Sequence, residues 1–187
     1  MEAFLVSAGL VAIAEIGDKT QLLAMILAAR YHKPVPIILG ILAATVANHA
    51  LAAFAGHFAA GLIAGQWFRI AVAASFIVMG LWTLVPDKLD DDEAPRARGG
   101  VFLTTLIAFF LVEMGDKTQL ATVALGAQFD NLVAVTAGTT LGMMIANVPA
   151  VLLGNALVQR ISLKAVRIAA ALSFVAVGVW MLAEALG

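Results

Sequence analysis

The chain has 187 residues, of which 63% are hydrophobic and 12% are charged, with a formal net charge of −1 and no cysteine. Its mean hydropathy of +1.01 excludes an ordinary soluble domain, and the lack of cysteine excludes disulfides and thiolate metal ligands. We therefore expect an all-α integral membrane protein.

Six apolar stretches follow one another along the chain, at residues 3–29, 35–64, 68–85, 100–127, 132–158 and 165–184. Each is close to or above the roughly 20 residues that a helix needs to cross a bilayer. The first stretch has neither a basic leader nor a small-residue cleavage site, so we interpret it as a helix and not as a signal peptide. We predict six transmembrane helices and no soluble domain. The sequence has no ATP-binding motif, and we expect neither enzyme activity nor a cofactor.

The charged connections predict how the helices are oriented. The connections after the first, third and fifth stretches hold eight basic residues: Arg30, Lys33, Lys88, Arg96, Arg98, Arg160, Lys164 and Arg167. The positive-inside rule therefore predicts that these connections are cytoplasmic and that both termini are external. The longest connection, residues 86–100 ("PDKLDDDEAPRARGG"), is interpreted as an acidic cytoplasmic linker; a cation-sensing role for its acidic run is the less favoured interpretation.

One hexapeptide occurs twice in the chain. "EIGDKT" at residues 15–20 returns as "EMGDKT" at residues 113–118, and the offset of 98 also relates Gly40 to Gly138 and "SFIVMGLW" (75–82) to "SFVAVGVW" (173–180). We predict two three-helix repeats, residues 1–85 and 101–187. Because three is odd, the second repeat enters the membrane from the other side, which gives the inverted topology typical of secondary transporters.

Both motifs are expected near the membrane midplane, where each charge costs about 2.5–3.5 kcal/mol and indicates a function. On a continuous helix the acids of each motif would share one face, and the lysine four residues after each glutamate could pair with it. The glycine between the acids permits close helix contact or a local break. The candidate cation-site residues are Glu15, Asp18, Glu113 and Asp116, with Lys19 and Lys117 as charge-compensating residues.

Neutral oxygens could complete the shell of a cation. The candidates are Thr20, Gln21, Thr118 and Gln119 in the motifs and Asn48 and Asn147 in the second and fifth helices, although the asparagines could equally form hydrogen bonds within the bundle. His49 is a weaker candidate for a proton path, because the second half has no matching histidine. Oxygen ligands without sulfur or a histidine partner favour Ca²⁺, Mn²⁺ or Mg²⁺ over zinc and copper.

The charge of the motifs indicates an exchange mechanism. The two lysines offset half of the negative charge of the four carboxylates. One divalent cation, two protons or two Na⁺ ions would neutralise the negative charge that remains. The competing interpretation, buried ion pairs that only fix helix packing, leaves Asp18 and Asp116 without partners and is therefore less favoured.

With two copies of Glu-x-Gly-Asp-Lys-Thr in three-helix halves joined by an acidic linker, the chain resembles the Gdt-type cation transporter family over essentially its whole length. Eukaryotic members of that family are proton-coupled calcium/manganese transporters of the Golgi, and bacterial members include manganese exporters. The resemblance implies Glu15, Asp18, Glu113 and Asp116 as cation-site residues and Thr20 and Thr118 as the family's hydroxyl position. The compact form resembles the bacterial members.

We therefore expect a multi-pass inner-membrane transporter that exports Mn²⁺, or Ca²⁺, in exchange for protons. Its partners would be the metal ion, protons and the lipid bilayer, with no nucleic acid; the oligomeric state is open. Two other functions are carried as alternatives: an exporter of small organic cations such as basic amino acids, and a membrane scaffold that transports nothing.

Overall fold

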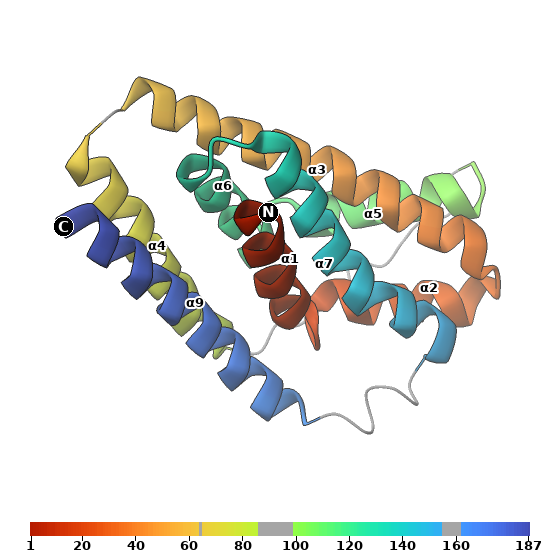
Figure 1. Cartoon of the computed structure of the whole chain (residues 1–187). Coiled ribbons are helices and arrows are strands. Elements are labelled where there is room, and N and C mark those ends of the chain that lie inside the picture. Colours follow the sequence, from red (N-terminus) through yellow and green to blue (C-terminus); the bar gives the residue numbers. More distant parts are fainter. Residues whose placement is uncertain (64, 86–98, 155–161) are drawn as a thin grey trace.

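The computed structural model describes residues 1–63, 65–85, 99–154 and 162–187. Most of the predicted linker, residues 86–98, lies outside them. In the described residues the chain is helical (Figure 1), and its helices are α1 (Glu2–Glu15), α2 (Lys19–Tyr31), α3 (Pro34–Leu62), α4 (Gln66–Thr83), α5 (Val101–Glu113), α6 (Lys117–Gln128), α7 (Leu132–Leu153) and α9 (Leu163–Leu186).

The first and fourth predicted helices are each broken in two at the repeated motif. Gly17 and Gly115 have φ of +84° and +80°, a left-handed conformation that glycine adopts without steric cost and that ends a right-handed helix. The residue after each glycine caps the next half-helix, and Asp18 does so with its side chain, which accepts a hydrogen bond of 2.7 Å from the backbone N–H of Lys19. The expectation that both acids of a motif share one helix face is therefore wrong.

Four helices of the described residues are long and apolar enough to cross a membrane: α3, α4, α7 and α9. α5 is a shorter apolar helix of 13 residues. α1, of 14 residues, is also too short to span alone. α2 turns away from the axis of α1 (Figure 1), so the break changes the direction of the chain as well as its backbone hydrogen bonding.

The first half-helix of each motif packs on a long helix of the other repeat, α1 on α7 and α5 on α3. Glycines make these contacts close. A Cβ added to Gly138 would lie 2.5 Å from the carbonyl oxygen of Phe4, and a Cβ added to Gly40 would lie 2.9 Å from that of Phe102. Because 98 residues separate Gly40 from Gly138 and Phe4 from Phe102, the two contacts join equivalent positions of the repeats.

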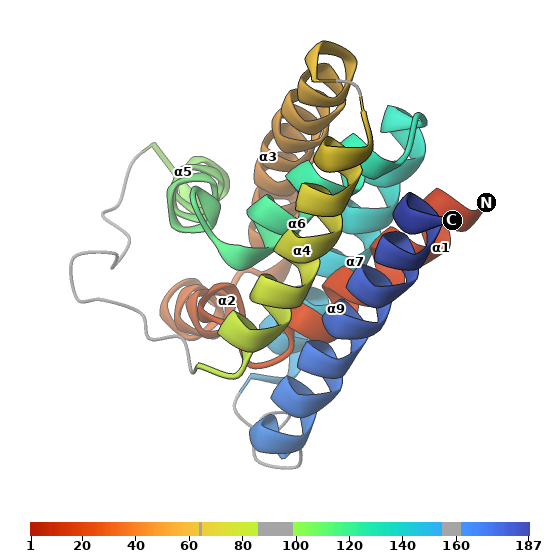
Figure 2. The same ribbon diagram turned by 90° about the vertical axis from the view of Figure 1, so that its left-hand side faces the viewer.

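α4 and α9 run side by side, with α5 on the opposite side of the molecule (Figure 2). Gly80 of α4 packs on the carbonyl of Ala171, and Gly178 of α9 packs on that of Ala73, so neither glycine has room for a side chain. Phe76 and Phe174 fill the space between these contacts, with ring centroids 6.2 Å apart. Small residues at matched positions thus bring the two backbones together.

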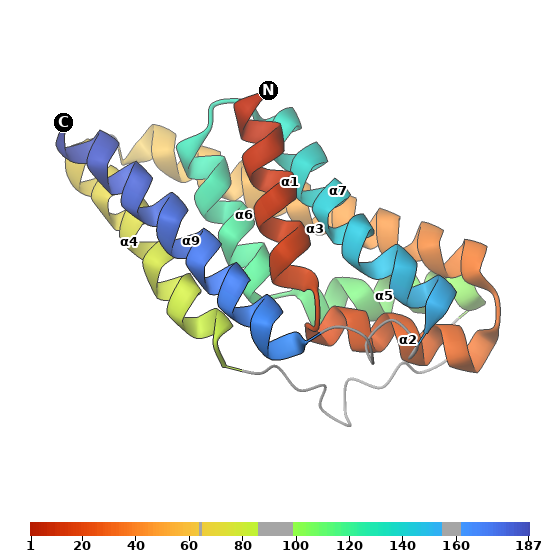
Figure 3. The same ribbon diagram turned by 60° about the horizontal axis from the view of Figure 1, so that its bottom comes forward.

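The α4–α9 pair packs against one side of the bundle. α4 lies on α6 and α9 lies on α1, while α2 and α5 lie on each other and extend away from the pair (Figure 3). α6, on which α4 lies, also packs closely on α3. A Cβ added to Gly126 would lie 2.7 Å from the Cα of Ala53. The arrangement of the helices around the two breaks is therefore asymmetric.

Candidate cation site

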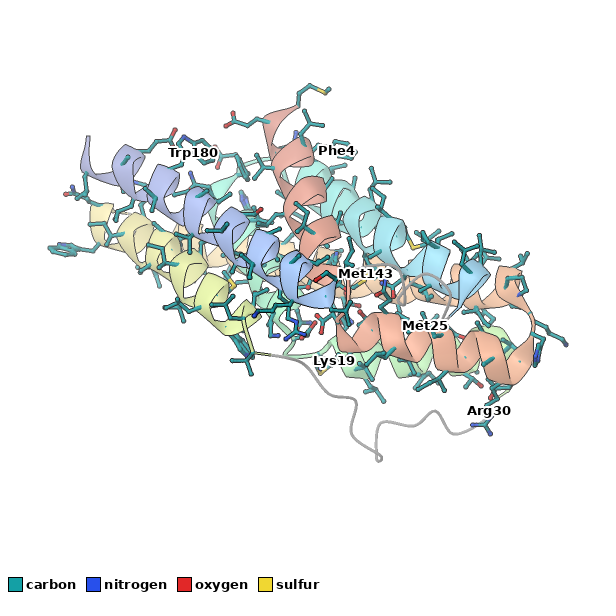
Figure 4. The ribbon with its side chains drawn as sticks, turned by 90° about the horizontal axis from the view of Figure 1, so that it is seen from below. Phe4, Lys19, Met25, Arg30, Met143 and Trp180 are labelled. Carbon is teal, nitrogen blue, oxygen red and sulfur yellow. The ribbon has the colours of Figure 1, made fainter. Side chains whose placement is uncertain are left out.

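The two helix breaks meet in the interior of the bundle. One carboxylate oxygen from each of Glu15, Asp18 and Asp116 can be chosen so that all three lie within 4.8 Å of one another. All three side chains are buried, Glu15 completely. Lys19, the first residue of α2, is half-buried and lies near a gathering of polar side-chain atoms (Figure 4). Acids from both motifs, almost 100 residues apart in the chain, thus form one anionic cluster.

The half-helices explain how acids are stabilised in the interior of the bundle. α2 and α6 begin at the breaks, so their unpaired N–H groups and the positive ends of their dipoles face the carboxylates. In both motifs the aspartate N–H also donates to the glutamate carbonyl, at 3.1 Å in each copy. The breaks therefore bring charged oxygens, backbone N–H groups and backbone carbonyls to one place.

Glu15 is held by the hydroxyls of both motifs. The Oγ1 of Thr20 donates to its Oε2 at 2.5 Å, and the Oγ1 of Thr118 donates to its Oε1. Both threonines are completely buried. The predicted hydroxyl positions thus converge on one glutamate, and the contact from Thr118 crosses between the repeats, which their spacing along a helix could not show.

Glu113 is held by different groups, all from α3. The amide of Asn48 donates to its Oε2 at 3.2 Å and to the carbonyl of Phe110 at 3.0 Å, and the Nε2 of His49 lies 2.7 Å from its Oε1. Glu113 is completely buried but is not part of the close group formed by the other three acids. Asn48 therefore presents its amide nitrogen, and not its carbonyl, to this carboxylate, and His49 contacts the second motif directly.

Gln21 and Gln119 form hydrogen bonds with the backbone at the two helix breaks. The Oε1 of Gln21 accepts from the N–H of Gly17 at 2.9 Å, and that of Gln119 accepts from the N–H of Gly115 at 2.6 Å. Gln21 also donates to the carbonyl of Ala146 at 3.1 Å, which ties the first break to α7. Each glutamine oxygen thus closes the turn of its own motif, a role that the sequence interpretation did not assign to it.

Asn147 lies on α7, where its amide donates to the carbonyl of Met143 at 3.1 Å and contacts the sulfur of that residue at 2.9 Å. Its Oδ1 is buried and has no hydrogen-bond partner among the residues that the structure describes. Asn147 remains a candidate oxygen donor near the first break.

The two lysines point to different surroundings. The Nζ of Lys19 lies 4.0 Å from Oδ1 of Asp116, in the other motif, so the observed pair differs from the Glu15–Lys19 pair expected on a continuous helix. The Nζ of Lys117 donates to the carbonyl of Val85 at 3.3 Å and lies 5.8 Å from the centroid of the Trp82 ring. Lys19 is therefore a lysine whose described partner is an acid of the cluster.

The two breaks differ in how they are covered. A Cβ at Gly17 would lie 2.7 Å from Cδ2 of Leu163, at the start of α9, whereas one at Gly115 would have no other described atom within 4 Å. Met114, beside Gly115, is 54% exposed. Leu163 of α9 thus covers the first break, and none of the described residues comes as close to Gly115.

The family described as the divalent cation/proton antiporter GDT1 matches residues 3–91 and 101–187. This chain belongs to the GDT1 family. A "Putative manganese exporter" of Vibrio cholerae serotype O1 is 49% identical over 168 residues, which cover 89% of this chain and 84% of that protein. A GDT1-like protein of Synechocystis is 31% identical, covering 93% of each chain, and GDT1-like protein 5 of Arabidopsis thaliana is 27% identical, covering 96% of this chain and 94% of its own. No solved structure matches.

The resemblance inferred from the duplicated motif is confirmed by these matches. The family consists of antiporters and not of enzymes, and its transported ions are divalent cations and protons. The apolar helices α3, α4, α7 and α9 are compatible with a protein that works within a membrane.

Proposed function

We propose that the protein exports Mn²⁺ in exchange for protons, with Ca²⁺ as the competing substrate, at a site formed by Glu15, Asp18, Asp116 and Glu113. The observation that carries this proposal is the burial of three carboxylates from the two motifs within 4.8 Å of one another. The family supports the reaction class, and the name of the Vibrio relative supports the metal.

The negative charge of the cluster explains why a metal ion and protons would exchange at this site. Three acids in a buried space repel one another, and the ammonium of Lys19 offsets only part of their charge. A divalent cation neutralises the remainder, and protons neutralise it equally well. Because both use the same oxygens, they exclude each other, so a site that carries metal in one direction carries protons in the other.

In the membrane arrangement that we propose, α1 with α2 and α5 with α6 each form one discontinuous span, which makes six spans in all. Residues 1–85 and 101–187 are the two inverted repeats, residues 86–100 are a cytoplasmic linker, and both termini face outward from a bacterial inner membrane. The matched contacts of Gly40 and Gly138 support the repeats. Half-helices that end near the midplane are the usual ion sites of such transporters.

Alternating access would come from movement of the α4–α9 pair relative to the breaks. Its close internal packing at Gly80 and Gly178 supports movement as a unit. Among the described residues, Leu163 lies over Gly17 and none lies as close to Gly115, and this difference supports a site that is accessible from one side at a time.

The proposal is tested by flux into proteoliposomes that contain the purified protein. We expect Mn²⁺ uptake that accelerates when a pH gradient is imposed, with proton movement in the opposite direction. Ca²⁺ is measured in parallel, and lysine and arginine test the organic-cation alternative. Transport of the amino acids without any divalent metal flux would reject the proposal.

The same assay tests the site. Asp116→Asn and Glu15→Gln keep side-chain size and remove one charge from the cluster, so we expect Mn²⁺ flux to fall by roughly tenfold or more. Asp130→Asn and Glu184→Gln change the same residue types at exposed positions outside the cluster and should transport normally. Near-normal flux in both cluster variants would assign the motif to packing alone.

A further inference from the structure

His49 provides the one imidazole that the described residues place against a motif carboxylate. It is completely buried in α3, with its Nε2 2.7 Å from Oε1 of the equally buried Glu113. Its Nδ1 is also buried and has no hydrogen-bond partner among the described residues. A buried ring nitrogen that is left unsatisfied calls for an explanation beyond packing, because it costs free energy.

The repeat does not explain this histidine. The offset of 98 makes Asn147 its counterpart, and Asn147 contacts Met143 of its own helix. A residue needed only to orient a motif glutamate would be expected at both positions, since the two motifs are otherwise alike. The imidazole is thus an addition to one half of the site.

The geometry places this imidazole where a ligand would be. Ligand atoms about 2.1 Å from one octahedral ion stand about 3 Å from their neighbours. The 2.7 Å between Nε2 of His49 and Oε1 of Glu113 is close to this separation, so a small displacement would let one ion contact both atoms. Glu113 belongs to the same break as Asp116, whose backbone N–H donates to the Glu113 carbonyl at 3.1 Å, so this pair lies beside the acidic cluster.

We propose that His49 is the residue that restricts the substrate to first-row transition-metal dications, by donating an imidazole nitrogen to the ion held by Glu113. Imidazole binds first-row transition-metal dications in the Irving–Williams order, with Mn²⁺ the weakest of them, whereas the harder Ca²⁺ and Mg²⁺ take oxygen ligands. A carboxylate-only site would not separate Mn²⁺ from Ca²⁺ in this way. The inference rests on the proposed cation transport and assigns its selectivity to one residue.

Pulsed electron paramagnetic resonance of bound Mn²⁺ detects the nitrogen directly. The chain has three histidines, and His32 and His57 are exposed. With the purified wild-type protein loaded with Mn²⁺, we expect an imidazole nitrogen modulation that changes when histidine alone is labelled with ¹⁵N. We expect the modulation to persist in His57→Gln and to vanish in His49→Gln, whose amide can still donate to Glu113.

Each outcome of this experiment is decisive. Bound Mn²⁺ without a histidine modulation would overturn the inference while leaving the cation site intact. A wild-type protein that binds no Mn²⁺ would overturn the proposed function and this inference together. The wild-type measurement requires no variant to fold.

Relative affinity provides a second readout. We expect His49→Gln to weaken Mn²⁺ and Co²⁺ binding by about tenfold or more and to change Ca²⁺ binding less than about twofold, because only the transition metals lose a favoured ligand. His49→Asn, which installs the residue found at the equivalent position of the other repeat, should behave in the same way. Equal losses for Mn²⁺ and Ca²⁺ would show that His49 only positions Glu113, and would reject the inference.

Discussion

Glu15 and Glu113 occupy the same position in the two motifs, yet their carboxylates are held by different donors. Threonine hydroxyls from both motifs bind Glu15, whereas the amide of Asn48 and the imidazole of His49 contact Glu113. Identical hexapeptide positions therefore provide chemically different oxygens. At the scale of the residue, the site is asymmetric although its sequence is duplicated.

Lys19 is predicted to compete with metal for the oxygens of Asp116, from which its Nζ lies 4.0 Å away. In Lys19→Gln that competitor is lost and the cluster is more negative. We expect Mn²⁺ affinity to be unchanged or raised several-fold while the transport rate falls, because the empty site must cross between its two states without its internal counter-charge.

Titration calorimetry of the purified protein and flux in proteoliposomes measure these two quantities. Lys33→Gln, at an exposed position outside the cluster, serves as the matched control and should alter neither. Weaker Mn²⁺ binding at an unchanged transport rate would assign Lys19 to packing.

At the scale of the element, two glycine turns convert each predicted helix into a pair of half-helices. Asp18 and Asp116 become capping residues, and their distance from the preceding glutamate is set by the turn and no longer by helical periodicity. The break also exposes helix termini to the interior of the bundle, which a continuous helix does not do.

Alanine at Gly17 or Gly115 tests the turns. Both glycines have φ near +80°, a conformation that costs an alanine about 1–2 kcal/mol. The methyl group added in Gly17→Ala would also contact the side chain of Leu163. We therefore expect this variant to lower the thermal unfolding midpoint and the Mn²⁺ flux more than Gly115→Ala does.

Gly61→Ala is the control for these variants. Gly61 lies within α3 with no other described atom within 4 Å of an added Cβ, so alanine there should leave flux unchanged and stability equal or slightly higher. Normal flux in Gly17→Ala would show that the break is not needed for transport.

At the scale of the whole molecule, the contact of Gly40 with Phe102 recurs as that of Gly138 with Phe4 at the offset of 98, but the α4–α9 pair packs mainly on α1 and α6 among the described residues. A molecule built from two similar halves can adopt two such arrangements, in which the pair lies on one side of the breaks or on the other. Exchange of accessibility between the two sides is the expected consequence.

The proposed topology is tested with the two ends of α9. This helix has 24 residues and is long enough to cross the hydrocarbon core. Because the chain has no native cysteine, Ser162→Cys and Gly187→Cys each introduce a single thiol, at exposed positions. In intact cells a membrane-impermeant maleimide should label Gly187→Cys and not Ser162→Cys.

Disruption of the membrane before labelling provides the control, since both thiols should then react. Labelling of both variants in intact cells, or of Ser162→Cys alone, would contradict the orientation inferred from the basic residues.

The sequence by itself determined the family and the helical class of the molecule, and it predicted the acids that the structure brings together, Glu15, Asp18 and Asp116. Mean hydropathy and the length of the apolar stretches indicate helices in a membrane, because hydrocarbon admits only segments that satisfy their own backbone hydrogen bonds. The duplicated hexapeptide at a fixed offset indicates two related halves, and charge at depth is too costly to be retained without a function.

Only the tertiary structure decided how these groups meet. A glycine in a helical pattern is compatible with either a continuous or a broken helix, and packing across the repeats selects the break. The contacts of Thr118 with Glu15, of Lys19 with Asp116 and of His49 with Glu113 join residues more than 60 positions apart. Local periodicity carries no information about such pairs, because they depend on which helices lie beside each other.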